Sequence, residues 1–194
     1  MAGEPVAGRG EEIDADVDTV NDEAGTGPAR TWRGPSIGRW VTFAAIAAMV
    51  VVLDQLSKGW IVANLAPGEG MVVLGEWLRL VHGQNSGILF GMLPQSAPIF
   101  AIVSMGVTAL IVVYHAKAGR GMVTTVALAL LLGGAIGNLL DRLRYGHVVD
   151  FVDMGIGSWR FYTYNVADAC ITTAIVLLIG MAMFPRVAEW GADD

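Results

Sequence analysis

The sequence predicts an all-α membrane protein with four transmembrane helices. Apolar residues make up 54% of the 194 residues and charged residues only 15%, whereas an ordinary soluble domain has about 25% charged residues. The mean hydropathy of the chain is accordingly high, at +0.56. Four long apolar runs without a charged residue account for this bias. They lie at 40–53, 98–114, 122–140 and 169–185.

The chain begins with a segment of a different kind, residues 1–38. Its first part, Met1–Ala29, combines Gly and Ala with eight acidic residues and almost no large apolar ones. Such a segment cannot bury enough apolar surface to become ordered. It also lacks the short basic start and early apolar stretch of a cleavable signal peptide. We therefore expect residues 1–38 to form a disordered, acidic cytosolic tail.

The four apolar runs predict one transmembrane domain, residues 39–186. A helix that spans a bilayer needs roughly 17–25 residues. The last three runs reach this length alone or with one flanking residue, whereas the first must include Asp54 and Lys58 in its last turns. A short cytosolic tail, residues 187–194, follows. The helices are expected at about 40–62, 96–115, 122–141 and 167–185.

Basic residues near the helix ends predict the orientation, because Lys and Arg concentrate on the cytoplasmic side. With four spans, three basic segments share one side of the membrane: the approach to the first helix, the short loop between the second and third, and the end of the fourth. We therefore expect both termini in the cytoplasm and two longer loops, 63–95 and 141–166, outside. The residues concerned are Arg30, Arg33, Arg39, Lys117, Arg120 and Arg186.

Cysteine and histidine usage argues against a metal site or a thiol nucleophile. Cys170 is the only cysteine and lies in the fourth apolar run, where packing is the simpler interpretation. The three histidines (His82, His115 and His147) are scattered and form no zinc-binding pattern. We expect no metal and no cofactor.

Two carboxylates, Asp150 and Asp168, flank an aromatic-rich loop before the fourth helix. Acidic side chains at the edge of a bilayer are costly and call for a function. Two that come together can share one proton and act as an acid/base pair on water, which is the chemistry of peptide-bond hydrolysis. Apolar neighbours should favour the protonated form of Asp150. Its segment, 148–151, reads as either extended or re-entrant.

Asp168 has a simpler alternative, because an acid in a first helical turn is commonly a cap. Asn165 is the better cap candidate, and Asp168 would then be free to point inward. Asp153, in a glycine-rich stretch, is expected to be a solvent-facing loop acid.

Two further clusters place charged residues on apolar helices. Asp54 and Lys58 are four positions apart and can pair on one helix face, either as an ion pair snorkelling to the outer interface or as part of a site. Asn138 and Asp141 lie three apart on the third helix, with Arg142 next, so a structural Asp141–Arg142 pair is the first interpretation. Asp141 is also the alternative catalytic acid.

Glycines mark two other segments. The spacing of Gly133 and Gly137 is typical of tightly packed membrane helices. The segment 85–91 combines Asn85, an amide donor and acceptor, with Gly87, which permits close backbone approach. By itself this second signal is weak.

Five motifs, taken in order, resemble the lipoprotein signal peptidases, also called signal peptidase II, which are aspartyl peptidases of the bacterial inner membrane. The resemblance covers about residues 40–185, with minor departures at Tyr164 and at Ile88-Leu89. The motifs are Asp54-Gln-x-x-Lys58, Asn85-x-Gly87-x-x-Phe90-Gly91, Gly137-Asn138-x-x-Asp141-Arg142, Val149-Asp150-Phe151 and Asn165-x-Ala167-Asp168.

The resemblance implies that Asp150 and Asp168 are the catalytic dyad, on the extracytoplasmic side of the membrane. It also implies a small extracytoplasmic β-cradle within 63–95 and an amphipathic segment near 141–166. The residues that would support the site or bind substrate are Asp54, Lys58, Asn85, Gly87, Asn138, Asp141, Arg142, Asn165 and Ala167.

The implied substrates are prolipoproteins that carry diacylglycerol on a cysteine, cut on the N-terminal side of that cysteine. Substrate and membrane lipids would be the partners, without nucleic acid, and a monomer is expected. A transporter or proton channel is the alternative class, since intramembrane acids also mark ion paths. The polar residues, however, gather at the outer helix ends and not through the membrane depth.

Overall fold

The computed structural model describes residues 34–86, 97–118 and 121–184, together with Gly3. Most of the predicted N-terminal tail, the predicted C-terminal tail 187–194, and Arg120 and Arg186 lie outside these residues. The described chain contains four helices and four strands. In chain order they are α1 (Ile37–Asn64), β1 (Gly70–Leu74), β2 (Leu78–Asn85), α2 (Ala97–Ala118), α3 (Met122–Tyr145), β3 (Val148–Ile156), β4 (Trp159–Arg160) and α4 (Val166–Met183).

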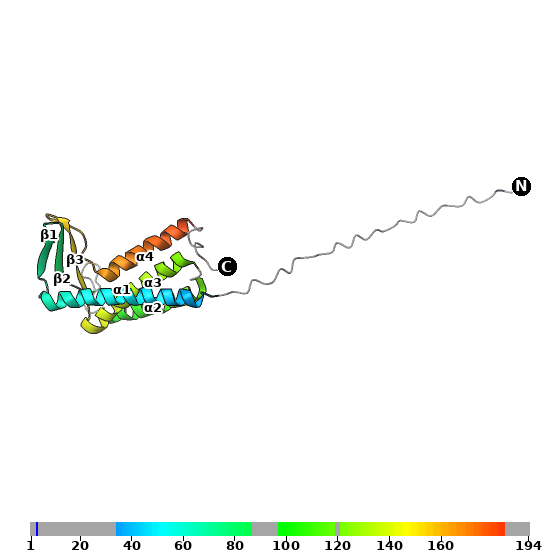
Figure 1. The fold of residues 1–194 in the computed structure, drawn as a ribbon, viewed down its shortest axis with the longest axis horizontal. Helices are drawn as coiled ribbons and strands as arrows, with labels where there is room; N and C mark the ends of the chain where they lie inside the picture. Colours follow the sequence, from blue (N-terminus) through cyan, green and yellow to red (C-terminus); the bar gives the residue numbers. More distant parts are fainter. Residues whose placement is uncertain (1–2, 4–33, 87–96, 119–120, 185–194) are drawn as a thin grey trace. The chain divides into compact units, whose positions relative to one another are not determined.

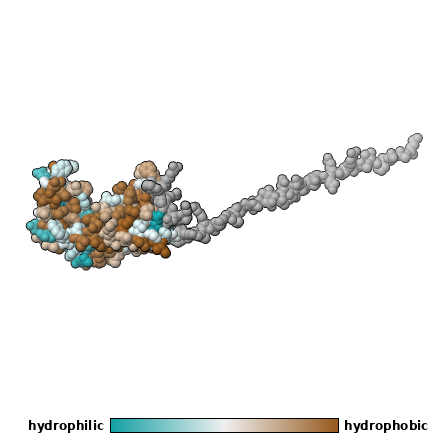
Figure 2. All heavy atoms as spheres, in the orientation of Figure 1, coloured by the Kyte–Doolittle hydropathy of each residue, from teal (hydrophilic) through white to brown (hydrophobic). Residues whose placement is uncertain are grey.

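All four helices are long and apolar enough to cross a membrane. They run side by side, and the sheet stands at the end of the bundle where α1 ends and α4 begins (Figure 1). Apolar residues cover much of the visible helix surface (Figure 2), which suits contact with lipid chains and not with water. The prediction of a four-helix membrane protein with a small β-region is confirmed.

Helix α3 is the centre of the bundle. In the 18-residue apolar stretch of each helix, 61% of the residues of α3 are buried, against 28% for α1 and 17% for α2 and for α4. One apolar cluster ties α1, α2 and α3 together, built around Phe43, Ile111 and Leu132. A second joins the end of α1 to β3 through Ile61 and Phe151. The central position of α3 puts its polar residues within reach of all the elements around the site.

The glycines of α3 permit this close packing, as their spacing predicts. A Cβ on Gly133 would lie 2.6 Å from the Val50 Cβ and 2.8 Å from the Ala47 carbonyl oxygen of α1. A Cβ on Gly134 would lie 2.6 Å from the Ala167 carbonyl oxygen of α4. Both distances are shorter than van der Waals contact, so larger residues would push the helices apart.

The strands form one antiparallel sheet in the order β1-β2-β3-β4. The expected cradle within 63–95 therefore supplies only half of it. Residues 148–156 form β3, so of the two readings for this segment the extended one is correct. Helix α3 ends at Gly146, whose φ of +73° suits glycine, and β3 starts two residues later. This short turn fixes Asp150 close to the end of α3.

Candidate active site

The site lies where the end of α3, the start of β3 and the start of α4 meet. Asp150 belongs to β3 and is paired with Gly83 of β2. A Cβ at Gly83 would lie 2.8 Å from the Asp150 carbonyl oxygen, so the bare backbone of Gly83 allows the two strands to come this close. Asp168 lies in the first turn of α4. We refer to Asp150 and Asp168 as the acid pair.

Asp150 is 3% exposed and is held by two side-chain amides. The Asn165 Nδ2 donates to its Oδ1 at 2.7 Å and the Asn85 Nδ2 donates to its Oδ2 at 2.9 Å. Burial raises the pKa of Asp150 to about 6; the Asn85 hydrogen bond opposes this shift, and the negative charge of Asp168 adds to it. This carboxyl can therefore gain or lose a proton near neutral pH.

Asp168 is tied to α3 and to its own helix start. Its Oδ1 accepts from Asn138 Nδ2 at 2.8 Å, and its Oδ2 faces the Asn165 backbone N–H at 3.4 Å. Asn165 is the N-cap of α4, as predicted, and its side chain accepts from the Asp168 N–H at 2.9 Å. Asp168 does point inward to α3 through Oδ1, as expected, and in addition its Oδ2 closes a reciprocal capping box with Asn165.

Asn165 joins the two acids. It is fully buried, and its Nδ2 faces Asn138 Oδ1 at 3.2 Å and the Val149 carbonyl oxygen at 3.3 Å as well as Asp150. Its Oδ1 holds the Asp168 backbone. One amide therefore places a carboxylate from the sheet beside a carboxylate from α4.

A second cluster of polar side chains lies near the acid pair. We call its members, Asp54, Gln55, Lys58 and Asp141, the lysine network. The Lys58 Nζ lies 2.8 Å from Asp54 Oδ2 and 2.9 Å from Asp141 Oδ2. Lys58 is 2% exposed and both acids are fully buried. The pair Asp54–Lys58 thus exists, but the snorkelling interpretation is wrong.

The lysine network anchors the elements that carry the acid pair. Asp54 Oδ1 accepts from the backbone N–H of Ala167 at 2.9 Å, and Asp141 Oδ2 accepts from the backbone N–H of Val149 at 3.0 Å. Lys58 also donates to Asn138 Oδ1 at 3.0 Å. Ala167 contributes its backbone N–H and is itself fully buried.

Asp141 is thereby occupied by structural contacts. Its salt-bridge partner is Lys58, and Arg142 acts on Asp141 through a longer-range charge attraction and not as the expected direct pair. The Arg142 Nη1 instead donates to the Asn138 carbonyl oxygen at 3.2 Å, and its guanidinium lies 5.8 Å from the centre of the Phe100 ring. Both oxygens of the Asp141 carboxylate are therefore used, by a lysine, a side-chain amide and a backbone N–H.

Sequence reasoning assigned no role to Gln55 or Tyr162. The Gln55 Nε2 donates to Asp141 Oδ1 at 2.9 Å and to the Gly137 carbonyl oxygen at 3.2 Å. A polar side chain on an apolar helix was the available signal for it. Tyr162 Oη accepts from the Asn85 Nδ2 at 2.7 Å, and no sequence pattern marked it.

Asp153 is not a solvent-facing loop acid, because it is 7% exposed in β3 and lies 2.9 Å from the Arg160 Nε and 3.4 Å from the Arg79 Nε. Gly87, predicted as a site residue, lies outside the described residues.

Within the residues that are described, no group of three or more His, Cys, Asp or Glu side chains could hold a metal ion.

Two pockets open beside the acid pair. One, of about 380 Å³, is lined by residues that include Asp150 and Thr163. The other, of about 510 Å³, is lined by residues that include Asp168, Ala169 and Thr172. Each acid therefore faces a space large enough for part of a peptide.

Residues 46–184 match the model of the family described as signal peptidase (SPase) II. The chain is 38% identical to the lipoprotein signal peptidase of Burkholderia cenocepacia over 78% of its length and 93% of that protein. It is 37% identical, with the same coverage, to the lipoprotein signal peptidase of Burkholderia vietnamiensis.

The fold is also similar to solved structures of bacterial membrane enzymes. One, determined in meso at 1.9 Å resolution, has a TM-score of 0.70 and 30% identity over 79% of this chain and 97% of its own. Another, at 2.3 Å resolution, has a TM-score of 0.71 and 28% identity over 84% and 98%. Because the match extends through the four helices and the sheet, this chain belongs to the signal peptidase II family of peptidases.

Proposed function

We propose that this protein is an aspartic endopeptidase that removes the signal peptide from diacylglyceryl-modified prolipoproteins. Cleavage falls on the N-terminal side of the lipidated cysteine. The observation that carries the proposal is the acid pair itself. Two carboxylates from different elements are joined by one buried amide, Asn165, and each borders an open pocket.

In the proposed reaction the acid pair shares one proton. The ionised carboxylate takes a proton from water while the water oxygen forms a bond to the scissile carbonyl carbon. The protonated carboxyl donates its proton to the carbonyl oxygen. The intermediate then collapses: the C–N bond breaks, the leaving amine takes up the proton that came from water, and one hydroxyl of the intermediate returns its proton to the carboxylate that had donated one, as the carbonyl re-forms.

The environment of each acid supports an assignment of roles. Asp150, with a pKa of about 6, is suited to hold the shared proton. Asp168 accepts a hydrogen bond from Asn138 and borders the larger pocket, and we assign it the role of taking the proton from water. Asn85, Asn138 and Asn165 orient the carboxylates, and the lysine network and Arg142 hold the surrounding backbone.

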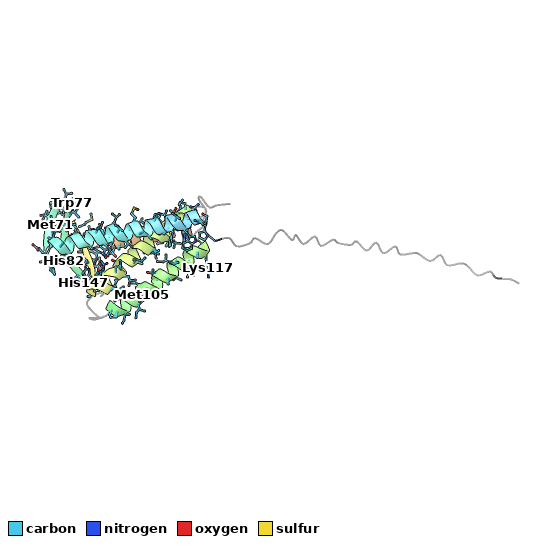
Figure 3. All side chains as sticks on the ribbon, turned by 60° about the horizontal axis from the view of Figure 1, so that its bottom comes forward. Met71, Trp77, His82, Met105, Lys117 and His147 are labelled. Carbon is cyan, nitrogen blue, oxygen red and sulfur yellow. The ribbon has the colours of Figure 1, made fainter. Side chains whose placement is uncertain are left out.

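The membrane setting suits such a substrate. A signal helix and two acyl chains would reach the site sideways through the bilayer, along apolar helix surfaces. Lys117 lies at the end of the bundle opposite the sheet (Figure 3), which supports a bacterial inner-membrane protein with cytoplasmic termini and an extracytoplasmic site. A monomer contains all the side chains that this mechanism uses.

The test follows cleavage of one diacylglyceryl-modified prolipoprotein by gel shift, with the purified protein in detergent. Asp150→Asn and Asp168→Asn should each lower the rate by about 10⁴-fold, the upper range for one acid/base group. Both variants should remain folded, because Asn keeps the size of the side chain.

Asp153→Asn is the matched control, since it makes the same change in the same strand but at a sheet ion pair. It should keep most of the activity. Wild-type protein that is folded yet leaves the prolipoprotein uncut would overturn the proposal, and near-native activity of Asp150→Asn would remove Asp150 from the dyad.

A further inference from the structure

Tyr162 lies between the two pockets of the acid pair. Tyr162 and Asn85 line both pockets, whereas Asp150 borders only the smaller one and Asp168 only the larger one. Tyr162 therefore borders the pocket of each acid. The Tyr162 side chain is 68% exposed, so it is accessible from the pocket side.

The hydroxyl of Tyr162 already accepts one hydrogen bond. Asn85 Nδ2 carries two hydrogens and uses them on Asp150 Oδ2 at 2.9 Å and on Tyr162 Oη at 2.7 Å. Tyr162 is thus the acceptor in its contact with Asn85, and a phenol has one hydrogen of its own to donate. Among the described residues, no acceptor for that hydrogen is recorded.

We propose that Tyr162 is a substrate-binding residue that donates its hydroxyl hydrogen to a backbone carbonyl of the bound prolipoprotein and, through Asn85, positions Asp150. The proposal rests on the function proposed above. Substrate, Tyr162, Asn85 and Asp150 then form one continuous chain of hydrogen bonds. In such a chain each donor strengthens the next hydrogen bond.

The chain of hydrogen bonds has a measurable consequence at Asp150. The hydrogen bond from Asn85 lowers the pKa of this carboxyl, against the effect of burial. Without the Tyr162 hydroxyl, the Asn85 amide loses one of its hydrogen-bond partners and holds Asp150 less firmly. The pKa of Asp150 should then rise further, and a role of the ring in packing alone would not produce this shift.

The experiment compares wild type with Tyr162→Phe, which keeps the ring and removes the hydroxyl. Cleavage of a diacylglyceryl-modified prolipoprotein is measured over a range of substrate concentrations and pH. We expect kcat/KM to fall about tenfold, the effect of one net hydrogen bond. KM should carry most of the loss, since the contact exists before the reaction. The pKa that controls the pH profile should move upward.

The matched control is Tyr145→Phe. Tyr145 ends α3 and contacts the His147 ring, and it lines neither pocket. Its kinetic constants should equal those of wild type. A second measurement avoids turnover: a fluorescent prolipoprotein is bound to Asp168→Asn and to Asp168→Asn/Tyr162→Phe. The double variant should bind about tenfold more weakly.

The outcomes separate this inference from the proposed function. If wild type cleaves and Tyr162→Phe has the same kcat/KM and pH profile, the inference is wrong and the proposed function stands. If wild type does not cleave, both the proposed function and the inference about Tyr162 are wrong. Equal binding to the two Asp168→Asn proteins would also overturn the substrate contact.

Discussion

The acid pair and the lysine network contain two aspartates each, yet their surroundings differ in kind. In the lysine network, Lys58 lies within 2.9 Å of both Asp54 and Asp141. In the acid pair, the hydrogen bonds recorded among the described residues come from the amides of asparagines. In the lysine network an ammonium group holds both carboxylates by salt bridges, whereas in the acid pair neutral amides orient them.

The two regions are joined through Asn138. Its Oδ1 accepts from Lys58 at 3.0 Å while its Nδ2 donates to Asp168 at 2.8 Å. The lysine network therefore supports the acid pair, and one amide lies between the Lys58 ammonium and Asp168. The comparison teaches that the nearest donor, a cation or a neutral amide, distinguishes the lysine network from the acid pair for which we propose the reaction.

The strongest way to break this comparison is Lys58→Met. It leaves Asp54 and Asp141 buried without their cation, and such a loss costs about 3–5 kcal/mol of folding free energy. Thermal unfolding in detergent should show a large drop in Tm, and activity should be lost with it. Lys117→Met, at an exposed position, is the control and should change little. A Lys58→Met protein as stable as wild type would show that the lysine does not stabilise the site.

A second test concerns the pH dependence of stability. The pKa of Asp150 is raised from 3.8 to about 6 by burial, so folding favours the protonated carboxyl. The resulting stability is present below about pH 4 and is lost as pH rises through about 6. At 1.36 kcal/mol per pKa unit, the loss is at most about 3 kcal/mol.

Asp150→Asn cannot ionise and should lack this loss. We expect the Tm difference between wild type and Asp150→Asn to change in favour of the variant as pH rises from 4 to about 7, measured by thermal scans in detergent. Asp153→Asn serves as the comparison for a β3 acid that lies beside two arginines. A difference that is constant with pH would contradict the raised pKa.

The smallest effect is expected at the exposed edge of the lysine network. Arg144 Nη1 donates to Gln55 Oε1 at 3.0 Å, in an exposed contact. Arg144→Gln should change the unfolding free energy by less than about 0.5 kcal/mol and leave cleavage unchanged. A loss of more than about 1 kcal/mol in thermal or denaturant unfolding would mean that the network depends on this surface contact.

Several features were predictable because their signals are local. An uninterrupted apolar run indicates a spanning helix without knowledge of its neighbours, and all four are present. The spacing of Gly133 and Gly137 predicted tight packing, and Asn165 was identified as the cap of α4 because capping depends on three residues of sequence. The same locality made Asp150 and Asp168 stand out as acids at the edges of apolar segments.

Other features failed because their partners are distant in sequence. Gln55 contacts Asp141 from 86 positions away, and Asn85 contacts Tyr162 from 77 positions away. Asp153 was read as exposed because its neighbours are glycines, but the sheet brings Arg79 and Arg160 to it. The Asp141–Arg142 pair was inferred from adjacency, although adjacent helical residues do not face each other.

The sequence by itself determined the membrane class, the four spans and the small set of polar residues from which any site must be built. Hydropathy and local spacing suffice for these, since each depends on a few neighbouring residues. Only the tertiary structure decided which acids lie beside a lysine and which beside amides. That division depends on α1, α3, β3 and α4 meeting at one end of the bundle (Figure 1), because the nearest donor of each carboxylate comes from a different element.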